Sequence, residues 1–308
     1  MTIDETVKIA GIGRTGARVI RHIKQAEWKC DLLAKIDPVI FLEDDTKSGE
    51  FDRNGTFPIR HADNDVIFDT LHRHFNNALI SFFITESTQD DIAAVEDVLD
   101  SLSGLSNPCM LSVIIFIEYK EAPSKAGGLN SSIRRLTTRP DTVVIFLEVE
   151  NARVVHECAL DAVFDIIAFT DFFEIRYSMV NNSLGDLREA LPGGRTGFVF
   201  TEHSKGDNTA SGIAGRLMKN KRFRQMGPVS DRAVMTIACS TGLYSTPADE
   251  VFKDLSNAHD ILSHDTCLDH ANIYYQIYED ENLLKGARIT IVLVGAEVLP
   301  GSGGAGNQ

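Results

Sequence analysis

The residues with the clearest potential for chemistry lie in two segments, each between an apolar run and a helical pattern. In the first segment, Gly11, Gly13 and Gly16 form a G-x-G-x-x-G motif after the apolar run "VKIA". Glycines at this spacing allow backbone N–H groups at a helix N-terminus to approach a phosphate closely. Arg14 and Arg18 could meet the same anion. This segment therefore predicts a nucleotide-binding or other anion-binding loop.

The second segment, "ITESTQDD" (residues 84–91), also lies between an apolar run and a helical pattern, but it is acidic. It contains no glycine, and its carboxylates would repel a triphosphate unless a cation intervened. Ser87 or Thr88 can instead cap the following helix, and aspartates in a first turn complement the helix dipole. We therefore predict a helix whose N-terminus is capped and complemented by its own side chains, in place of a phosphate-binding loop. The acids are Glu86, Asp90 and Asp91.

Alternating strand and helix patterns position these segments and predict a mostly parallel sheet with helices on both faces. After residue 150 one long apolar helix follows, and then strands with helices to one side, which is typical of an α+β domain. The predicted strands of the first half are 7–13, 30–37, 78–85, 110–119 and 141–149, with a polar connection at 43–66. The predicted organisation is an α/β domain at 1–150, a central helix at 151–168, an α+β domain at 169–299 and a flexible glycine-rich tail at 300–308.

The composition is that of a folded, soluble, cytoplasmic protein, with 43% hydrophobic and 24% charged residues among 308. A net charge of −14 disfavours nucleic acid and anionic lipid as partners, and no apolar run is long enough for membrane insertion. Two basic clusters, at 134–139 and 216–224, are either solvated helix faces or docking patches. The cysteines are odd in number and scattered, so we expect reduced core thiols. They are Cys30, Cys109, Cys158, Cys239 and Cys267.

Four segments of the second half resemble FtsZ, the bacterial tubulin homologue, in the family's order and near its spacing. The resemblance implies a tubulin/FtsZ-like fold, in which a Rossmann-like parallel-sheet domain and a smaller α+β domain are joined by a central helix. It also implies GTP hydrolysis coupled to filament assembly in cell division, at a site shared by neighbouring subunits. "VKIAGIGRTGARVIRHI" is similar to the family's first strand, glycine loop and helix. The four segments are "TDFFEIRYSMV", "GDNTASGIAGRLMKN", "DRAVMTIACSTGLYSTPADEVFKDL" and "ANIYYQIYEDENLLKGARITIVLVGAE".

The same resemblance shows where the nucleotide-binding residues have changed. The family's glycine-rich signature corresponds to residues 86–91, and Glu148 stands in place of a base-contacting asparagine. Asp171 and Glu174 correspond to the carboxylates that act on a neighbour's nucleotide, while Phe169 replaces an asparagine. We therefore expect an FtsZ-like protein with a degenerate GTP-binding signature that does not hydrolyse GTP and needs no cofactor. It would act by contacts with itself or with an FtsZ-type filament protein, as polymer or regulator.

Several alternatives remain open. One is an active filament protein that binds and hydrolyses GTP on the glycine loop. Another is an NAD(P)-binding Rossmann protein, because Asp37 ends a predicted strand 21 residues after Gly16. Asp171 could be a helix N-cap rather than a catalytic group. A zinc site is a further possibility, although the ligand spacing matches no standard finger and a solvated loop without metal is the favoured interpretation. Its ligands would be His259, His264, Cys267 and His270.

Overall fold

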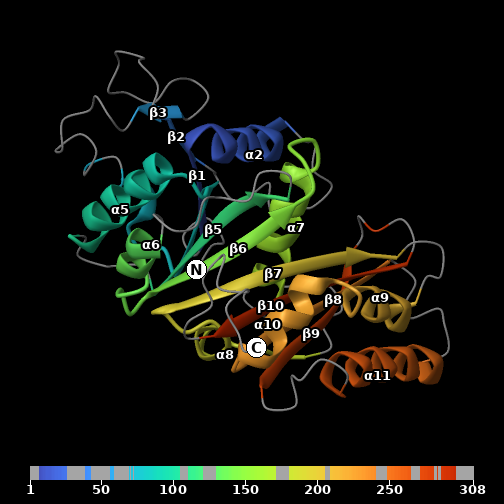
Figure 1. Ribbon diagram of the computed structural model, residues 1–308. Helices are drawn as coiled ribbons and strands as arrows, with labels where there is room; N and C mark the ends of the chain where they lie inside the picture. Colours follow the sequence, from blue (N-terminus) through green and yellow to red (C-terminus); the bar gives the residue numbers. More distant parts are fainter. Residues whose placement is uncertain are drawn as a thin grey trace, which may run out of the picture. The chain divides into compact units, whose positions relative to one another are not determined.

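The computed structural model in Figure 1 divides the chain into two compact units. The first contains residues 1–160 and 192–194, and the second contains 161–191 and 195–308. The boundary lies within helix α7 (Val155–Ala168), which is the helix expected at 151–168. The domain limits drawn from the sequence stay a prediction. The structure describes residues 7–25, 39–42, 56–58, 69, 71, 73–104, 110–120, 130–170, 180–204, 209–240, 248–264, 271–280, 283 and 286–295.

The first unit contains a parallel sheet in which the described strands follow the order β3-β2-β1-β4-β5-β6. Its central strands are continuous apolar runs, as expected where helices cover both faces of a sheet. This confirms the parallel sheet predicted from the sequence. The strands are β1 (Val7–Ile12), β2 (Val39–Leu42), β3 (Thr56–Pro58), β4 (Ile80–Glu86), β5 (Leu111–Tyr119) and β6 (Thr142–Val149).

One prediction for this sheet was wrong. The connection assigned to residues 43–66 contains β3, a three-residue strand that pairs with β2 and ends in Pro58. A strand this short has no readable alternation, and proline is tolerated because the strand lies at the edge of the order. The strand predicted at 30–37 lies outside the described residues.

The helices α2 (Gly13–Gln25), α5 (Gln89–Ser103) and α6 (Asn130–Leu136) belong to this unit. The chain leaves β1 toward β2 on one side and leaves β4 toward β5 on the other. Because such crossovers are right-handed, α2 and α5 cover opposite faces of the sheet. The carboxyl ends of β1 and β4 therefore form a topological switch point, which is where open α/β sheets usually bind ligands.

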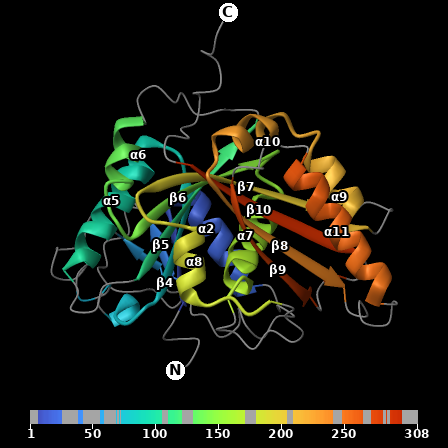
Figure 2. The ribbon, with the colours of Figure 1, turned by 90° about the horizontal axis from the view of Figure 1, so that it is seen from below.

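The second unit contains strands in the order β7-β10-β8-β9, with β10 antiparallel to both neighbours and β8 parallel to β9. Helices α9 and α11 lie side by side in this unit (Figure 2). The mixed sheet with its helices confirms the predicted α+β architecture. The strands are β7 (Arg195–His203), β8 (Arg232–Ser240), β9 (Asn272–Asp280) and β10 (Ala287–Gly295). The helices are α8 (Leu184–Ala190), α9 (Ala210–Leu217), α10 (Lys221–Met226) and α11 (Ala248–His264), with a 3₁₀ turn at Gly227–Val229.

A buried ion-pair network holds the C-terminal half of α7 to this sheet. Arg288 on β10 donates two hydrogen bonds to the carboxylate of Asp165 on α7, from Nε to Oδ2 at 2.9 Å and from Nη2 to Oδ1 at 2.7 Å. In the same guanidinium, Nη1 lies 3.2 Å from Asp161 Oδ1 and Nη2 lies 3.1 Å from Asp280 Oδ2. Burial, the largest single cause, would lower the pKa of Arg288, but the neighbouring groups, with the charge of Asp165 first among them, together outweigh it and hold the pKa well above its ordinary value.

Two hydroxyl groups complete the coordination of Asp165. Tyr278 donates to Oδ1 and Thr290 donates to Oδ2, each at 2.5 Å. Burial, and then the charge of Asp165, raise the pKa of Tyr278 well above its usual value, so the phenol stays a donor. Charge-assisted hydrogen bonds of this kind therefore fix α7 to β9 and β10.

Candidate functional site

The glycine motif follows β1 at the switch point between β1 and β4, and its glycines serve packing. A β-carbon at Gly11 would collide with the backbone of Gly16, and one at Gly16 would collide with the carbonyl of Ile84 on β4. Both glycines are therefore needed to bring α2 against β1 and β4, with or without a ligand. Only Gly13 of the three has a left-handed backbone, with φ of 68°. The motif spacing thus has a complete structural explanation.

The acidic segment caps α5 as expected. The N-cap is Thr88, whose Oγ1 accepts from the backbone N–H of Asp91 at 3.1 Å, and Asp90 and Asp91 fall in the first turn. Ser87, the other candidate, is 5% exposed, and its backbone N–H donates to the carbonyl of Ile117. The prediction of a capped helix in place of a glycine loop is confirmed.

Asp91 also reaches a second helix, which the sequence did not indicate. A β-carbon at Gly13, the first residue of α2, would collide with the carboxylate of Asp91. The first turn of α2 contains no acidic residue of its own. Asp91 therefore places negative charge at the positive end of α2, where a bound anion would otherwise be stabilised.

A second carboxylate lies at the same helix start. Thr15 donates from Oγ1 to Glu86 Oε2 at 2.7 Å, and the same hydroxyl lies 3.5 Å from the phenol oxygen of Tyr119. Thr15 belongs to α2, Glu86 ends β4 and Tyr119 ends β5. Sequence reasoning missed Thr15 and Tyr119, although a hydroxyl inside a glycine motif was the available signal.

Further glutamates lie at the carboxyl ends of the neighbouring strands. The register of β5 and β6 sets Glu118 opposite Glu148. Two residues further along the chain, Glu150 forms an ion pair with Lys120, with Oε1 and Nζ 3.8 Å apart. We refer to the surface formed by the sheet ends and the start of α5 as the acidic edge. Carboxylates gathered at one edge oppose the approach of a triphosphate. The acidic edge contains Glu86, Asp90, Asp91, Glu148 and Glu150.

The arginines of the motif lie outside this arrangement. Arg14 and Arg18 are exposed on α2, and neither side chain forms an ion pair within the described part of the chain. Asp171 and Glu174, the predicted partner-site carboxylates, lie outside the described residues, as does Asp37. Phe169, which replaces a family asparagine, is fully buried, and its carbonyl accepts from the side chain of Gln276 at 3.4 Å.

Metal binding has no support among the residues that the structure describes, because no group of three or more His, Cys, Asp and Glu is arranged to hold an ion. Nδ1 of His259 lies 3.7 Å from Oδ1 of Asp260, the next residue on α11. The side chain of His264 and residues Cys267 and His270 lie outside the described set. No described helix is long and apolar enough to cross a membrane.

Of the described cysteines, Cys158 is half-buried on α7 and Cys239 is buried on β8. Burial, and next the charges of Asp254 and Glu279, raise the pKa of Cys239 to about 12. A thiol with so little thiolate is a poor nucleophile and metal ligand, which fits the expected core role. Cys30, Cys109 and Cys267 lie outside the described residues.

The parallel-sheet unit, the mixed-sheet unit and helix α7, whose residues are divided between the two units, together define a protein with the FtsZ/tubulin fold. Comparison with solved structures shows the same. An empty FtsZ dimer from M. jannaschii matches with a TM-score of 0.67 and 13% identity over 95% of this chain and 88% of that chain. The GTPγS-form TubZ protofilament of Bacillus thuringiensis serovar israelensis matches with a TM-score of 0.62 and 11% identity, over 96% and 88%.

TubZ of Clostridium botulinum phage c-st is also similar, with a TM-score of 0.57 and 11% identity over 97% of this chain and 94% of that chain. No family model matches the sequence. No curated protein matches it either. At these identities the structural likeness establishes the fold, which confirms the fold predicted from the sequence.

Proposed function

We propose that this protein is a subunit with the tubulin fold that acts through contacts with itself or with an FtsZ-type filament protein, and that it neither binds nor hydrolyses GTP. The observation that carries the proposal is the Asp91 carboxylate against Gly13. A phosphate at the start of α2 would have to displace this carboxylate and then lie among the other acids of the edge. Both steps oppose anion binding.

Assembly is supported by what the similar structures are. They include an FtsZ dimer, GTPγS-form and GDP-form protofilaments of TubZ, and a four-stranded TubZ filament. This chain has the same fold over nearly its full length. The acidic edge opposes nucleotide binding but leaves contacts between subunits possible. We therefore expect subunit contacts that do not depend on a bound nucleotide. Polymer formation and regulation of another filament are the two forms such contacts could take.

The second candidate function is an active GTPase filament protein. Two observations favour it, namely the nucleotide forms of the TubZ structures and the exposed Arg14 and Arg18 on α2. In that case Asp91 would swing away from Gly13, and Asp171 and Glu174 would serve a neighbour's nucleotide. A dinucleotide is the weakest candidate, and enhanced NADH fluorescence on mixing would reveal it.

The deciding experiment measures nucleotide directly. Protein purified without added nucleotide is denatured, and the released small molecules are separated by chromatography. Calorimetry with GTP and GDP and a phosphate-release assay follow, each with and without Mg²⁺. We expect no nucleotide, no heat of binding and no phosphate release.

The control is Asp91→Ala, which vacates the start of α2 while Thr88 remains as the cap. Binding of GTP by the native chain at micromolar affinity would refute the proposal. Binding by Asp91→Ala alone would support it, because that result identifies the carboxylate as the block. Electron microscopy with and without GTP then tests whether filaments form independently of nucleotide.

A further inference from the structure

The two basic clusters noted in the sequence differ in how their cations are paired. In the cluster at 134–139, Arg135 forms a two-point ion pair with Glu96 of α5, at 2.9 and 3.0 Å, and Arg139 pairs with Asp100 of the same helix. Two of its three arginines are therefore paired within the first unit. This cluster is a salt-bridged surface rather than a docking patch.

The cluster at 216–224 lies in a long segment without acids. Residues 210–230 contain five cations and no carboxylate, in a chain whose acids outnumber its lysines and arginines by 44 to 30. Arg216 is paired, because it donates to the carbonyl of His203 at 2.6 Å and its Nε lies 3.7 Å from Glu202 Oε2. One cation of the segment is therefore used within the second unit itself.

Helix α10 is fixed to the sheet of the second unit by residues that lie between its exposed cations. The guanidinium of Arg222 lies 4.2 Å from the ring centroid of Phe198 on β7. Phe223 is fully buried, and its ring meets that of Phe200, also on β7, edge to face with the centroids 5.1 Å apart. The side chain of Asn220 caps the helix by accepting from the backbone N–H groups of Arg222 and Phe223. The helix is therefore ordered before any ligand binds, which lowers the entropic cost of binding.

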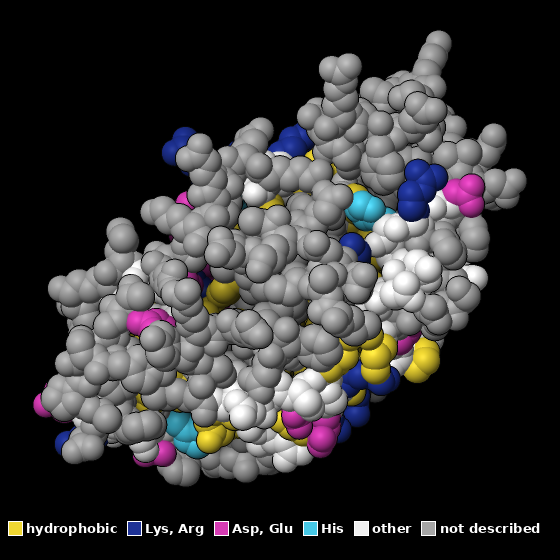
Figure 3. Space-filling model, turned by 180° about the vertical axis from the view of Figure 1, so that it is seen from behind, with side chains coloured by type: hydrophobic (Ala, Val, Ile, Leu, Met, Phe, Trp, Pro, Cys, Tyr) yellow, Lys and Arg dark blue, Asp and Glu magenta, His cyan; other side chains and the backbone are white. Residues whose placement is uncertain are grey.

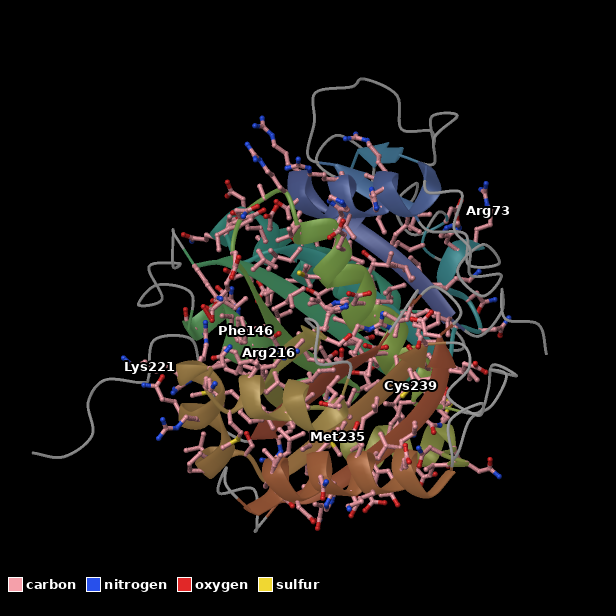
Figure 4. The ribbon with its side chains drawn as sticks, turned by 90° about the vertical axis from the view of Figure 1, so that its right-hand side faces the viewer. Arg73, Phe146, Arg216, Lys221, Met235 and Cys239 are labelled. Carbon is pink, nitrogen blue, oxygen red and sulfur yellow. The ribbon has the colours of Figure 1, made fainter. Side chains whose placement is uncertain are left out.

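Three further cations of the segment lie on its surface. The side chains of Lys219, Lys221 and Arg224 are exposed, and they form no hydrogen bond or ion pair within the described part of the chain. We call these three residues the basic patch. Lys221 projects away from α10, as Figure 4 shows. Lys221 and Arg224 are three positions apart on the helix, so they are surface neighbours with β-carbons about 5–6 Å apart.

The surroundings of the basic patch leave its charge available. Asp231, the first acid after α10 in the chain, is already paired, with its Oδ2 3.7 Å from Nη2 of Arg195. Val229, on the turn that follows α10, is 56% exposed and adds an apolar side chain next to this helix in the chain. On the face drawn in Figure 3, by contrast, described acidic and basic side chains are interspersed. Three cations with an exposed apolar neighbour are therefore a distinct surface feature of this chain.

We propose that the basic patch is the docking site for an acidic peptide segment of another protein. Such docking goes beyond the proposed function, because it does not depend on self-association. Charge complementarity supports it, since each of the three cations can pair with a carboxylate, and basic clusters of this kind recognise acidic motifs. Carboxylates three or four positions apart on a helical peptide match the spacing of Lys221 and Arg224. An apolar residue beside those carboxylates would cover Val229.

An acidic peptide fits the basic patch better than a membrane or a nucleic acid. A bilayer binds an interfacial helix by its apolar face, but Phe223 and Met226, the apolar residues of α10, are buried. A lipid surface or a nucleic acid also extends far beyond three cations, and the chain's net charge of −14 repels it. A short peptide meets mainly the charges within a Debye length, which is about 8 Å at physiological salt. The local excess of cations therefore favours a small acidic ligand.

The test measures the binding of defined peptides to the full-length chain by fluorescence anisotropy. The probe is a fluorescein-labelled helical peptide with glutamates three and four positions apart and one leucine beside them. A reference peptide carries glutamine at every glutamate position, and a second reference carries alanine in place of the leucine. The label is the same in all three, so differences between them report the carboxylates and the leucine.

Two triple variants separate the basic patch from the net charge of the chain. The control variant removes three exposed cations elsewhere and changes the net charge by the same amount. Circular dichroism checks that both variants are folded. The patch variant is Lys219→Gln, Lys221→Gln and Arg224→Gln. The control variant is Arg73→Gln, Arg134→Gln and Lys253→Gln.

We expect the glutamate peptide to bind the native chain at about 50 mM salt and to bind more weakly near 300 mM, where the Debye length is shorter. The glutamine peptide should not bind. An exposed ion pair contributes about two- to fivefold to affinity, so the patch variant should bind about tenfold more weakly or worse. The control variant should bind like the native chain. Val229→Ser should weaken binding of the leucine peptide about threefold and leave binding of the alanine peptide unchanged.

Three results would overturn the inference. The first is that the native chain does not bind the glutamate peptide at low salt, and the second is that the patch variant binds it as tightly as the native chain. The third comes from vesicles containing anionic lipid, measured in parallel by sedimentation. If they bind through the basic patch while the peptides do not, the partner is a membrane surface. None of these results bears on the nucleotide measurements, so the proposed function is tested separately.

Discussion

The buried network around Arg288 makes the most direct test of how α7 is held. The perturbation is Arg288→Met, which keeps much of the aliphatic stem and removes the guanidinium. Arg288 is 4% exposed, and it forms ion pairs with Asp165 and Asp280, which are 0% and 4% exposed, and with the partly exposed Asp161. The substitution removes a guanidinium that pairs with all three carboxylates.

The expected loss follows from this burial. Removing one partner of a buried ion pair costs about 3–5 kcal/mol, because it leaves an uncompensated charge in a poorly hydrated site. An exposed pair costs about 0.2–1 kcal/mol. The matched control is therefore Arg195→Met, since Arg195 lies 3.7 Å from Asp231 and both side chains are partly exposed.

The assay is urea unfolding at pH 7 followed by circular dichroism, with the free energy of unfolding compared between variants. The double variant Arg288→Met with Asp165→Asn should be less destabilised than the sum of the two single variants, because the pair is coupled. If Arg288→Met costs no more than Arg195→Met, the network does not hold α7 and the reasoning is refuted.

The remaining predictions concern the switch point and one histidine pair. Gly16→Ala should cost about 3 kcal/mol by collision with backbone, whereas Gly215→Ala, where a β-carbon meets nothing within 4 Å, should be neutral or stabilising in the same unfolding assay. Thr88→Ala removes the α5 cap and should cost about 1 kcal/mol by urea unfolding, while Thr88→Ser should keep most of it. Burial, and next the nearby His156, lower the pKa of His22, so the folded chain should lose stability as pH falls below about 6.5. His22→Gln should flatten that part of the curve in thermal unfolding between about pH 8 and 5.5, and an unchanged slope would contradict the assignment.

Much of the architecture could be predicted because burial on both faces of a sheet leaves a pattern in the sequence. The runs that became β4, β5 and β6 are almost uninterrupted apolar stretches, and they were recognised as strands of a parallel sheet. Short or weakly patterned elements were missed. The strand β3 and the helices α8 and α10 have too few residues for a period to emerge.

The sequence by itself determined that the turn before α5 is a cap, because capping depends on residue types a few positions apart along one chain segment. It also determined that the glycines stand in a motif, but not what they are for. Only the tertiary structure decided that Gly11 and Gly16 serve helix packing and that Asp91 of α5 lies against Gly13 of α2. The physical reason is that these contacts join residues far apart in sequence, at the point where two crossovers leave the sheet in opposite directions.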